Sequence, residues 1–213
     1  ERTMVKRYLP SELVDRLADL EELRLGGTRE LVTILFADIR GFTTYSETHD
    51  PEQVVEMINH YYKHAARIVR MHEGIVDKYE GDCVVAHFGT PLRPIENHAW
   101  KAVLAAWQIE EAIRADHATM PVKDRLHFGI GINTGEAVAG NVGGEEQMDY
   151  TLIGDAVNLS KRLQENAKPG QILIGEQTYQ IIQDRVRVEK LEPLQVKGRM
   201  AYEQAYSVVD ILG

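Results

Sequence analysis

Cysteine is almost absent from this chain, which has a single one, Cys83, among its 213 residues. No internal disulfide can form, and this favours a reducing compartment, so we expect a cytoplasmic protein. Long apolar runs are also lacking. No stretch approaches the roughly 20 residues needed to cross a bilayer, and no basic segment precedes an apolar one as in a secretory signal. A membrane segment of a longer protein could lie outside these residues.

Basic residues are too few to balance the acidic ones: 24 Lys and Arg stand against 33 Asp and Glu, a formal net charge of −9. This balance argues against nucleic acid as a partner, because broad binding of nucleic acid depends on a basic surface. An acidic protein can still bind a polyphosphate with the help of metal ions and a few well-placed cations. The 44% of hydrophobic and 27% of charged residues are typical of a globular protein, and the length predicts one domain.

The chain opens with a segment that differs from the rest. Residues 1–22 carry apolar side chains at helical spacing, and the Gly26-Gly27 pair follows. We interpret residues 1–27 as a linker helix from an upstream regulatory region and residues 28–213 as the main domain. In that domain we expect, in chain order, a strand at 31–39, a polar turn at 43–50, a helix at 51–71 with Val55 in its buried stripe, a β-hairpin at 75–88, a helix at 97–116, strands at 126–133 and 136–142, an extended segment at 148–153, a helix at 155–166 capped by Asp155, and a tail with a strand at 171–174, a helix at 176–182 and strands at 186–191 and 202–209.

The order strand, helix, hairpin, helix, strand is the β-α-β-β-α-β pattern of a ferredoxin-like α+β fold, here with additional helices and strands at the C-terminal side. In that fold the first strand lies at the centre of the sheet, so its end can meet the turn of the hairpin. Asp38 follows the apolar run of the first strand, and Asp82 lies in the hairpin turn. Two carboxylates at neighbouring strand ends could together hold a divalent metal ion.

Four motifs resemble the catalytic domain of class III nucleotidyl cyclases, and the resemblance spans residues 31–209. The motifs are F-A-D-I-R-G-F-T from Phe36, D-K-Y-E-G-D from Asp77, G-I-N-T-G from Gly131 and Y-T-L-I-G-D-A-V-N-L-S-K-R-L from Tyr150. Each motif alone is weak, but the four occur in the order and spacing of the family. The resemblance implies a head-to-tail homodimer whose active sites lie at the interface and are assembled from both chains.

The resemblance also implies the metal chemistry. In such a site Asp38, Asp82 and the main-chain carbonyl of Ile39 would bind two Mg²⁺ or Mn²⁺ ions. Two such ions can activate the attacking oxygen and neutralise the charge on the phosphate oxygens. Either aspartate on its own could simply end a strand.

Base recognition is implied for Lys78 and Thr151, with Leu152 beside them. A lysine can donate to N1 of adenine, whereas the N1–H of guanine is itself a donor. The common adenylyl form of the family carries an aspartate where this chain has Thr151, and guanylyl cyclases typically have Glu and Cys at the two positions. The Lys and Thr pairing resembles the adenylyl cyclases that respond to bicarbonate. Thr151 could also be an ordinary β-branched strand residue.

Asn158 and Arg162 are four residues apart on one expected helix and so share a face. Under the resemblance, Asn158 positions the ribose and Arg162 stabilises the charge on the five-coordinate α-phosphate. A guanidinium suits that task because it is planar and stays charged. In an isolated amphipathic helix the same two residues would be an exposed polar pair.

The triphosphate has further expected contacts. The turn containing Gly41, Phe42 and Thr43 can present main-chain N–H groups to the β- and γ-phosphates, although it is not a Walker loop. Lys197 matches a family lysine that contacts the triphosphate. The chain departs from some relatives at one position, where Gly129 replaces a phosphate-contacting arginine. Lys161 stands where a serine is common and could offset that loss.

The reaction expected from these residues is the conversion of ATP to 3′,5′-cyclic AMP and pyrophosphate. Cyclic GMP synthesis stays open, and so does a nucleotide-sensing module that dimerises without turnover. The general base is undetermined among Asp38, water and the nucleotide. Elsewhere, His60 and His64 have an i,i+4 spacing that could ligate zinc, but H-E-x-x-H is absent and a partly exposed pair is the favoured interpretation.

Overall fold

The fold was analysed in a computed structural model that describes residues 26–144, 147–195 and 202–213. The expected linker helix at 1–22 and Lys197 lie outside these residues. The elements, in chain order, are β1 (Gly26–Arg40), α3 (Phe42–Thr48), α4 (Pro51–Met71), β2 (Ile75–Glu80), β3 (Cys83–Phe88), α5 (His98–Asp116), a 3₁₀ turn (Val122–Asp124), β4 (His127–Gly144), β5 (Gln147–Ile153), α6 (Asp155–Asn166), β6 (Ile172–Gly175), α7 (Glu176–Ile182), a second 3₁₀ turn (Gln183–Arg185), β7 (Val186–Lys190), β8 (Leu194–Gln195), β9 (Tyr202–Glu203) and β10 (Ala205–Ile211).

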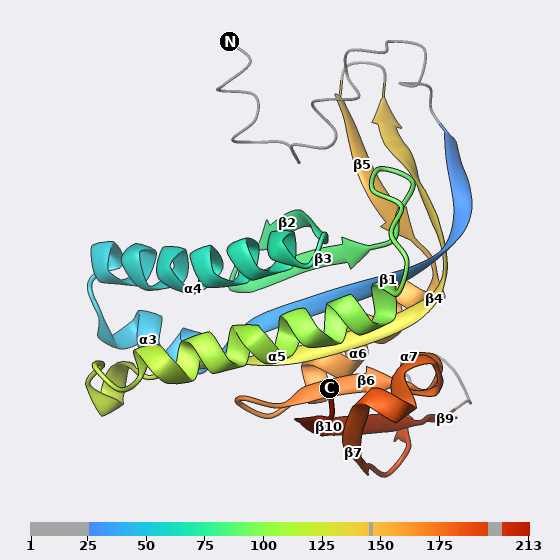
Figure 1. Ribbon diagram of the computed structural model, residues 1–213. Helices are drawn as coiled ribbons and strands as arrows, with labels where there is room; N and C mark the ends of the chain where they lie inside the picture. Colours follow the sequence, from blue (N-terminus) through green and yellow to red (C-terminus); the bar gives the residue numbers. More distant parts are fainter. Residues whose placement is uncertain (1–25, 145–146, 196–201) are drawn as a thin grey trace.

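The main sheet has the strand order β2-β3-β1-β4-β6-β10-β7, and β5 pairs with β4 outside that path. Its first four strands confirm the ferredoxin-like α+β core, with β1 antiparallel to both β3 and β4. The expected C-terminal additions continue the sheet through β6, which is parallel to β4. In Figure 1 the helices α4 and α5 run along one side of the sheet, while α6 lies on the other.

Two packed layers of apolar residues explain this arrangement. Alternate residues of β1 and β3 enter the core shared with α4 and α5, and the others face α6 and β5. Helix α4 begins at Pro51 with a capping box between Asp50 and Gln53, and it ends at Met71 as expected. Val55 is an exception in its expected buried stripe, because its side chain is 56% exposed.

The expected polar turn at 43–50 is wrong, because residues Phe42–Thr48 form α3. Gly41 adopts a left-handed conformation (φ 81°) that ends β1 and starts this helix. Burial of Tyr45, whose ring stacks on His49, anchors the short helix to the core. The hydroxyl of Ser46 donates to the carbonyl of Thr43 (2.7 Å), so the polar residues are used inside the helix.

The strands expected at 126–133 and 136–142 are one continuous strand, β4, because Thr134-Gly135 does not turn. β1 pairs with β4 from Gly26 opposite Asn141 to Arg40 opposite His127, so one long ladder spans both segments. Two smaller expectations also differ. The N-cap of α6 is Gly154 rather than Asp155, and the strand expected at 202–209 is divided between β9 and β10.

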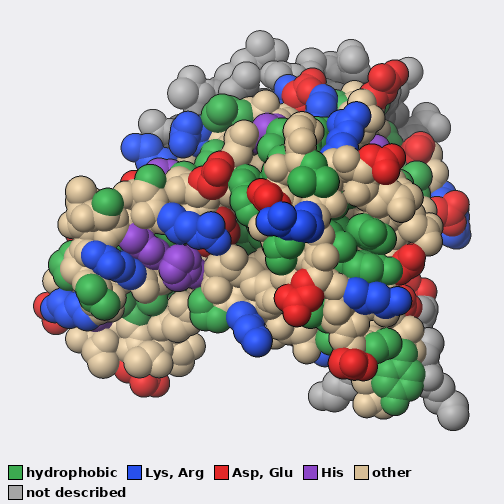
Figure 2. Space-filling view, turned by 60° about the horizontal axis from the view of Figure 1, so that its bottom comes forward, with side chains coloured by type: hydrophobic (Ala, Val, Ile, Leu, Met, Phe, Trp, Pro, Cys, Tyr) green, Lys and Arg blue, Asp and Glu red, His purple; other side chains and the backbone are tan. Residues whose placement is uncertain are grey.

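The outer parts of β4 and β5 form an arm that extends from the body of the molecule together with the start of β1 (Figure 1). On the face drawn in Figure 2, acidic and basic side chains alternate, with hydrophobic side chains between them. Within the described part of the chain, no helix combines the length and the apolar character that crossing a membrane requires.

Candidate functional site

The end of β1 and the β2–β3 turn bring the two expected metal-binding carboxylates together. Asp38 is paired with Cys83, and the N–H of Ile39 donates to the carbonyl of Asp82 (3.0 Å). The pKa of Asp38 is raised to about 6, chiefly by burial and then by the negative charge of Asp82, while the positive charge of Arg40 lowers it. Two adjacent carboxylates that repel each other form an oxygen donor set suited to Mg²⁺ or Mn²⁺. The residues present therefore fit the expected ions.

Arg40 lies on the same face of β1 as Asp38, two residues further on. Its Nη1 donates to Oδ1 of Asp38 (3.0 Å), and its Nε donates to the carbonyl of Ala167 (3.0 Å). A third donor, Nη2, contacts the carbonyl of Gln164. One guanidinium thus ties the first carboxylate to the C-terminal end of α6. Our sequence reasoning missed Arg40, although its position inside D-I-R-G-F, two residues after Asp38, could have suggested a shared face.

Gly129 lies on β4 opposite Asp38, at a position where the structure leaves no room for a side chain. A Cβ at that position would lie 2.4 Å from Nε of Arg40, within the space that the guanidinium fills. The departure noted in the sequence, glycine in place of a phosphate-contacting arginine, is therefore accompanied by an arginine that reaches the same place from β1.

Four of the residues expected to bind the nucleotide line one cavity of about 190 Å³: Lys78, Thr151, Leu152 and Asn158. They come from β2, β5 and α6. A register shift in β2 between Val76 and Lys78 places Lys78 opposite Val85, so its side chain lies on the α6 side of the sheet. The fold brings these residues together in a single chain. Neither Asp38 nor Asp82 lines this cavity.

His87 also lines the small cavity, and our sequence reasoning missed it. It is 1% exposed, and its Nδ1 lies 3.2 Å from the hydroxyl of Thr90. Among the described residues, its Nε2 has no hydrogen-bond partner. Burial lowers the pKa of His87 to about 4, and the nearby charge of Lys78 acts in the same direction, so the ring is neutral at pH 7. A buried histidine in a strand of apolar residues gives no sequence signal of such a position.

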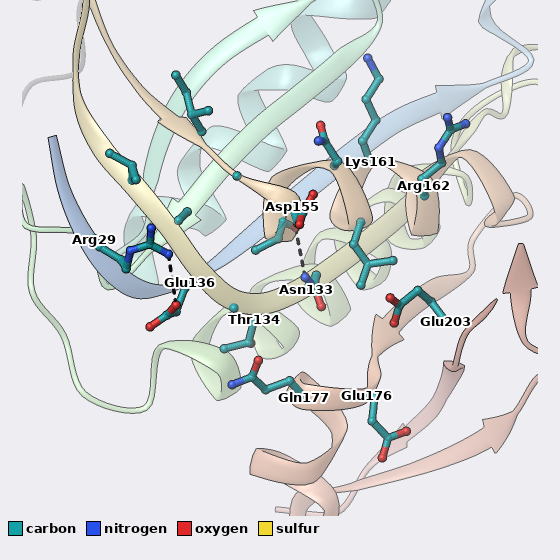
Figure 3. A pocket seen from close by; sticks show the side chains of 18 of the residues that line it. Arg29, Asn133, Thr134, Glu136, Asp155, Lys161, Arg162, Glu176, Gln177 and Glu203 are labelled. Atoms are coloured by element: carbon teal, nitrogen blue, oxygen red, sulfur yellow. Dashed lines mark hydrogen bonds and ion pairs between the residues drawn. The ribbon is translucent and has the colours of Figure 1, made fainter. Parts of the chain in front are cut away.

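A second, larger groove of about 1330 Å³ adjoins the first, and Asn158 and Lys161 line both. Figure 3 shows Lys161 and Arg162 extending from α6, with Glu176 and Gln177 across the groove. Arg162 is paired with Glu165 (2.9 Å), and both side chains are partly exposed, so the pair is weak and easily exchanged for another anion. Five acidic and three basic residues line the groove, and two of the basic residues, Lys161 and Arg162, lie on α6.

The other expected site residues are placed as follows. Gly41 ends β1, and Phe42 and Thr43 open α3, directly after the Asp38 strand end. Cys83 is buried, and burial followed by the neighbouring acidic groups raises the pKa of its thiol to about 12. The thiol is therefore protonated at neutral pH, and Cys83 packs as a small apolar residue of the core.

Comparison with known proteins adds independent information. Residues 27–209 match the family model described as the adenylate and guanylate cyclase catalytic domain. Adenylate cyclase 1 of Rhizobium meliloti (strain 1021) is 33% identical over 212 residues, which are 96% of this chain. The chain covers 31% of the length of that protein.

Two solved structures are similar at the same sequence identity of 34%. The adenylyl cyclase CyaB from P. aeruginosa has a TM-score of 0.81, covering 87% of this chain and 97% of its own. The guanylyl cyclase Cya2 has a TM-score of 0.80, covering 88% of this chain and 95% of its own. Overall similarity therefore does not separate the two activities, and the choice between them depends on the residues of the small cavity.

Proposed function

The chain belongs to the family of adenylate and guanylate cyclase catalytic domains, and we propose that it converts ATP to 3′,5′-cyclic AMP and pyrophosphate. The observation that carries the choice of ATP is the shared cavity of Lys78, Thr151 and Asn158. We further propose that residues 28–213 form the catalytic domain and that residues 1–27 connect it to an upstream regulatory domain.

The small cavity suits adenine by its hydrogen-bonding groups. The ammonium of Lys78 donates to the unprotonated N1, and the hydroxyl of Thr151 accepts from the exocyclic amine. Leu152 supplies an apolar contact for the ring. Guanine would bring its N1–H against the ammonium, and one unmatched buried group costs about 1–3 kcal/mol, or roughly 5- to 150-fold in affinity. We propose bicarbonate activation on the strength of the same Lys and Thr pairing.

The reaction is an intramolecular displacement. The 3′-hydroxyl of ATP gives up its proton and its oxygen attacks the α-phosphorus. The bond between the α-phosphorus and the oxygen that bridges to the β-phosphate breaks, and pyrophosphate leaves with that oxygen. Asn158 holds the ribose, and Arg162 exchanges its partner Glu165 for the charge that develops on the α-phosphate. Gly41, Phe42 and Thr43 contact the terminal phosphates through main-chain N–H groups, and Lys197 assists them.

Two Mg²⁺ or Mn²⁺ ions, held by Asp38, Asp82 and the carbonyl of Ile39, would supply charge neutralisation and activation of the attacking oxygen. We propose that these acidic groups act on a nucleotide bound mainly by the partner chain in a homodimer. The separation of the acidic pair from the small cavity supports this arrangement. Exposed apolar side chains on the arm, Val138 at 37% and Val142 at 46%, offer a dimerisation surface. Within the family, one solved guanylate cyclase domain holds GTP, and another is described as a non-canonical dimer.

Mixing two inactive variants tests the shared site. Asp38→Ala damages the side of the shared site that one chain provides, and Arg162→Ala damages the side that its partner provides. After random exchange of subunits, half of the dimers should contain one chain of each kind and one intact site out of two. About a quarter of the wild-type activity should therefore return. The matched control is a mixture of Asp38→Ala with Asp82→Ala. Both changes then fall in the same half, and no activity should return.

Two results would contradict the proposal. If the first mixture stays inactive although subunits exchange, the site is not shared. If the wild-type chain with Mn²⁺ releases no pyrophosphate from ATP, the alternative of a nucleotide sensor is favoured. Parallel assays with ATP and GTP decide between cyclic AMP and cyclic GMP, which the equal identity to CyaB and Cya2 does not separate.

A further inference from the structure

A group of metal-ligating side chains lies between α4 and α5, apart from the proposed active site. His60 and His64 are one turn apart on α4, and Asp116 is the last residue of α5. Nε2 of each histidine lies 2.7 Å from the same carboxylate oxygen, Oδ2 of Asp116. One ligand atom from each of the three residues lies within 4.8 Å of the others.

We propose that His60, His64 and Asp116 bind a divalent transition-metal ion of the Zn²⁺ class. Two imidazole nitrogens and one carboxylate oxygen form a donor set that zinc takes, with a solvent ligand in the fourth position. In a tetrahedral site with bonds of about 2.1 Å, neighbouring ligand atoms lie about 3.4 Å apart. The two contacts of 2.7 Å therefore need to open by less than 1 Å, which side-chain rotation allows.

The sequence alone did not favour this site, because His60 and His64 provide only two ligands. Asp116 is 52 residues further along the chain than His64, and only the packing of α5 on α4 adds it. The side chains are between 20% and 41% exposed, which gives an ion a direct path from solvent. The geometry thus supplies the third ligand and the access that the sequence pattern lacked.

The donor set also distinguishes this site from the acidic pair at the end of β1. Asp38 and Asp82 offer oxygen atoms, which Mg²⁺ and Mn²⁺ prefer, whereas imidazole nitrogen favours Zn²⁺, Co²⁺ and Ni²⁺. Nδ1 of His64 is buried and has no hydrogen-bond partner within the described residues. A metal-bound histidine whose second ring nitrogen makes no hydrogen bond binds the ion about 10- to 100-fold more weakly. We therefore expect a dissociation constant in the micromolar range.

The test is titration of the EDTA-treated full chain with Co²⁺ and Zn²⁺ in the absence of nucleotide. We expect Co²⁺ to develop visible d–d absorption that saturates at one equivalent for this site, and Zn²⁺ to displace it and raise the melting temperature by several degrees. Asp116→Asn keeps a hydrogen-bond acceptor between the two histidines but removes the charged ligand. This variant and His64→Ala should bind Co²⁺ at least about 10-fold more weakly.

Two controls keep the result specific. His72→Ala removes another histidine contact between α4 and α5, the 2.8 Å contact with Gln108, and should leave Co²⁺ affinity unchanged. The double variant Asp38→Asn/Asp82→Asn should retain the Co²⁺ spectrum. The proposal is overturned if Asp116→Asn, shown to be folded by circular dichroism, binds Co²⁺ as tightly as wild type. It is equally overturned if the double variant loses the spectrum, because the ion would then lie at the β1 end.

Discussion

Helix α6 packs closely on the sheet at Gly131, and replacing this residue with alanine tests whether the placement of that helix controls catalysis. A Cβ on Gly131 would lie 2.1 Å from the backbone nitrogen of Gln164 and 2.4 Å from the carbonyl oxygen of Ser160. Both are main-chain atoms of α6, so no side chain can rotate to relieve the overlap. Real Cβ contacts stay above 3.0 Å, so the helix must withdraw by about 1 Å.

The energetic effect follows from what that withdrawal breaks. The hydroxyl of Ser160 donates to the carbonyls of Ile34 (2.8 Å) and Gly131 (3.1 Å), and these bonds hold α6 to β1 and β4. Overpacking and weakened hydrogen bonds together should cost about 2–4 kcal/mol, or roughly 5–15 °C in melting temperature. Because Asn158 and Arg162 move with α6, a misplacement of about 1 Å should lower kcat by about 100-fold.

The assay measures kcat and KM for ATP at a temperature where circular dichroism shows the variant to be folded. Ile132→Ala is the matched control, because Ile132 is the next residue of β4 and is buried against α4 and α5 on the opposite face. It should lose about 2–5 kcal/mol of stability and keep its kcat. If folded Gly131→Ala turns over at the wild-type rate, the roles given to Asn158 and Arg162 are wrong. If Ile132→Ala loses as much kcat, the effect is only one of stability.

Three further changes have defined outcomes. Arg40→Ala removes the donor shared by Asp38 and the end of α6, so kcat/KM for ATP should fall about 10- to 100-fold, and Arg40→Lys should recover little because one ammonium cannot span three acceptors. Burial lowers the pKa of His87 from 6.5 to about 4, so the unfolded chain binds the proton more tightly than the folded chain. The free energy of unfolding of wild type, measured with urea, should therefore fall by about 2 kcal/mol between pH 7 and pH 5. His87→Leu should remove most of that fall. Cys83, whose pKa is raised to about 12, should react with a thiolate-selective reagent at least about 100-fold more slowly in the native chain than in urea.

Most of the fold could be predicted because its local signals agree with one another. The apolar spacing of 51–71 and the hairpin at 75–88 gave elements whose bounds match α4, β2 and β3 closely. The failures share a tertiary origin. Helix α3 depends on the burial of Tyr45. The continuity of β4 through Thr134-Gly135 depends on β1, because every residue of β1 pairs with β4. Neither effect is visible in a window of neighbouring residues.

Only part of the candidate site could be predicted from the sequence. The resemblance named Lys78, Thr151 and Asn158, and the structure places them around one cavity, although their roles in catalysis stay predictions. His87 in the same cavity was missed because a strand histidine carries no motif of its own. Arg40 was missed because two of its three acceptors are main-chain carbonyls, which any sequence provides.

Arg40 and Gly129 also show what a departure from a family pattern looks like in three dimensions. The hypothesis from the sequence was that Lys161 could offset the missing arginine at 129, and Lys161 lies on α6 and lines both cavities. The guanidinium of Arg40 occupies the space that a side chain at 129 would need. Three acceptors already hold that guanidinium, so it positions Asp38 and the end of α6 rather than serving as a mobile phosphate ligand. The guanidinium of Arg40 therefore holds Asp38 against the end of α6, and contact between Lys161 and the triphosphate stays a prediction.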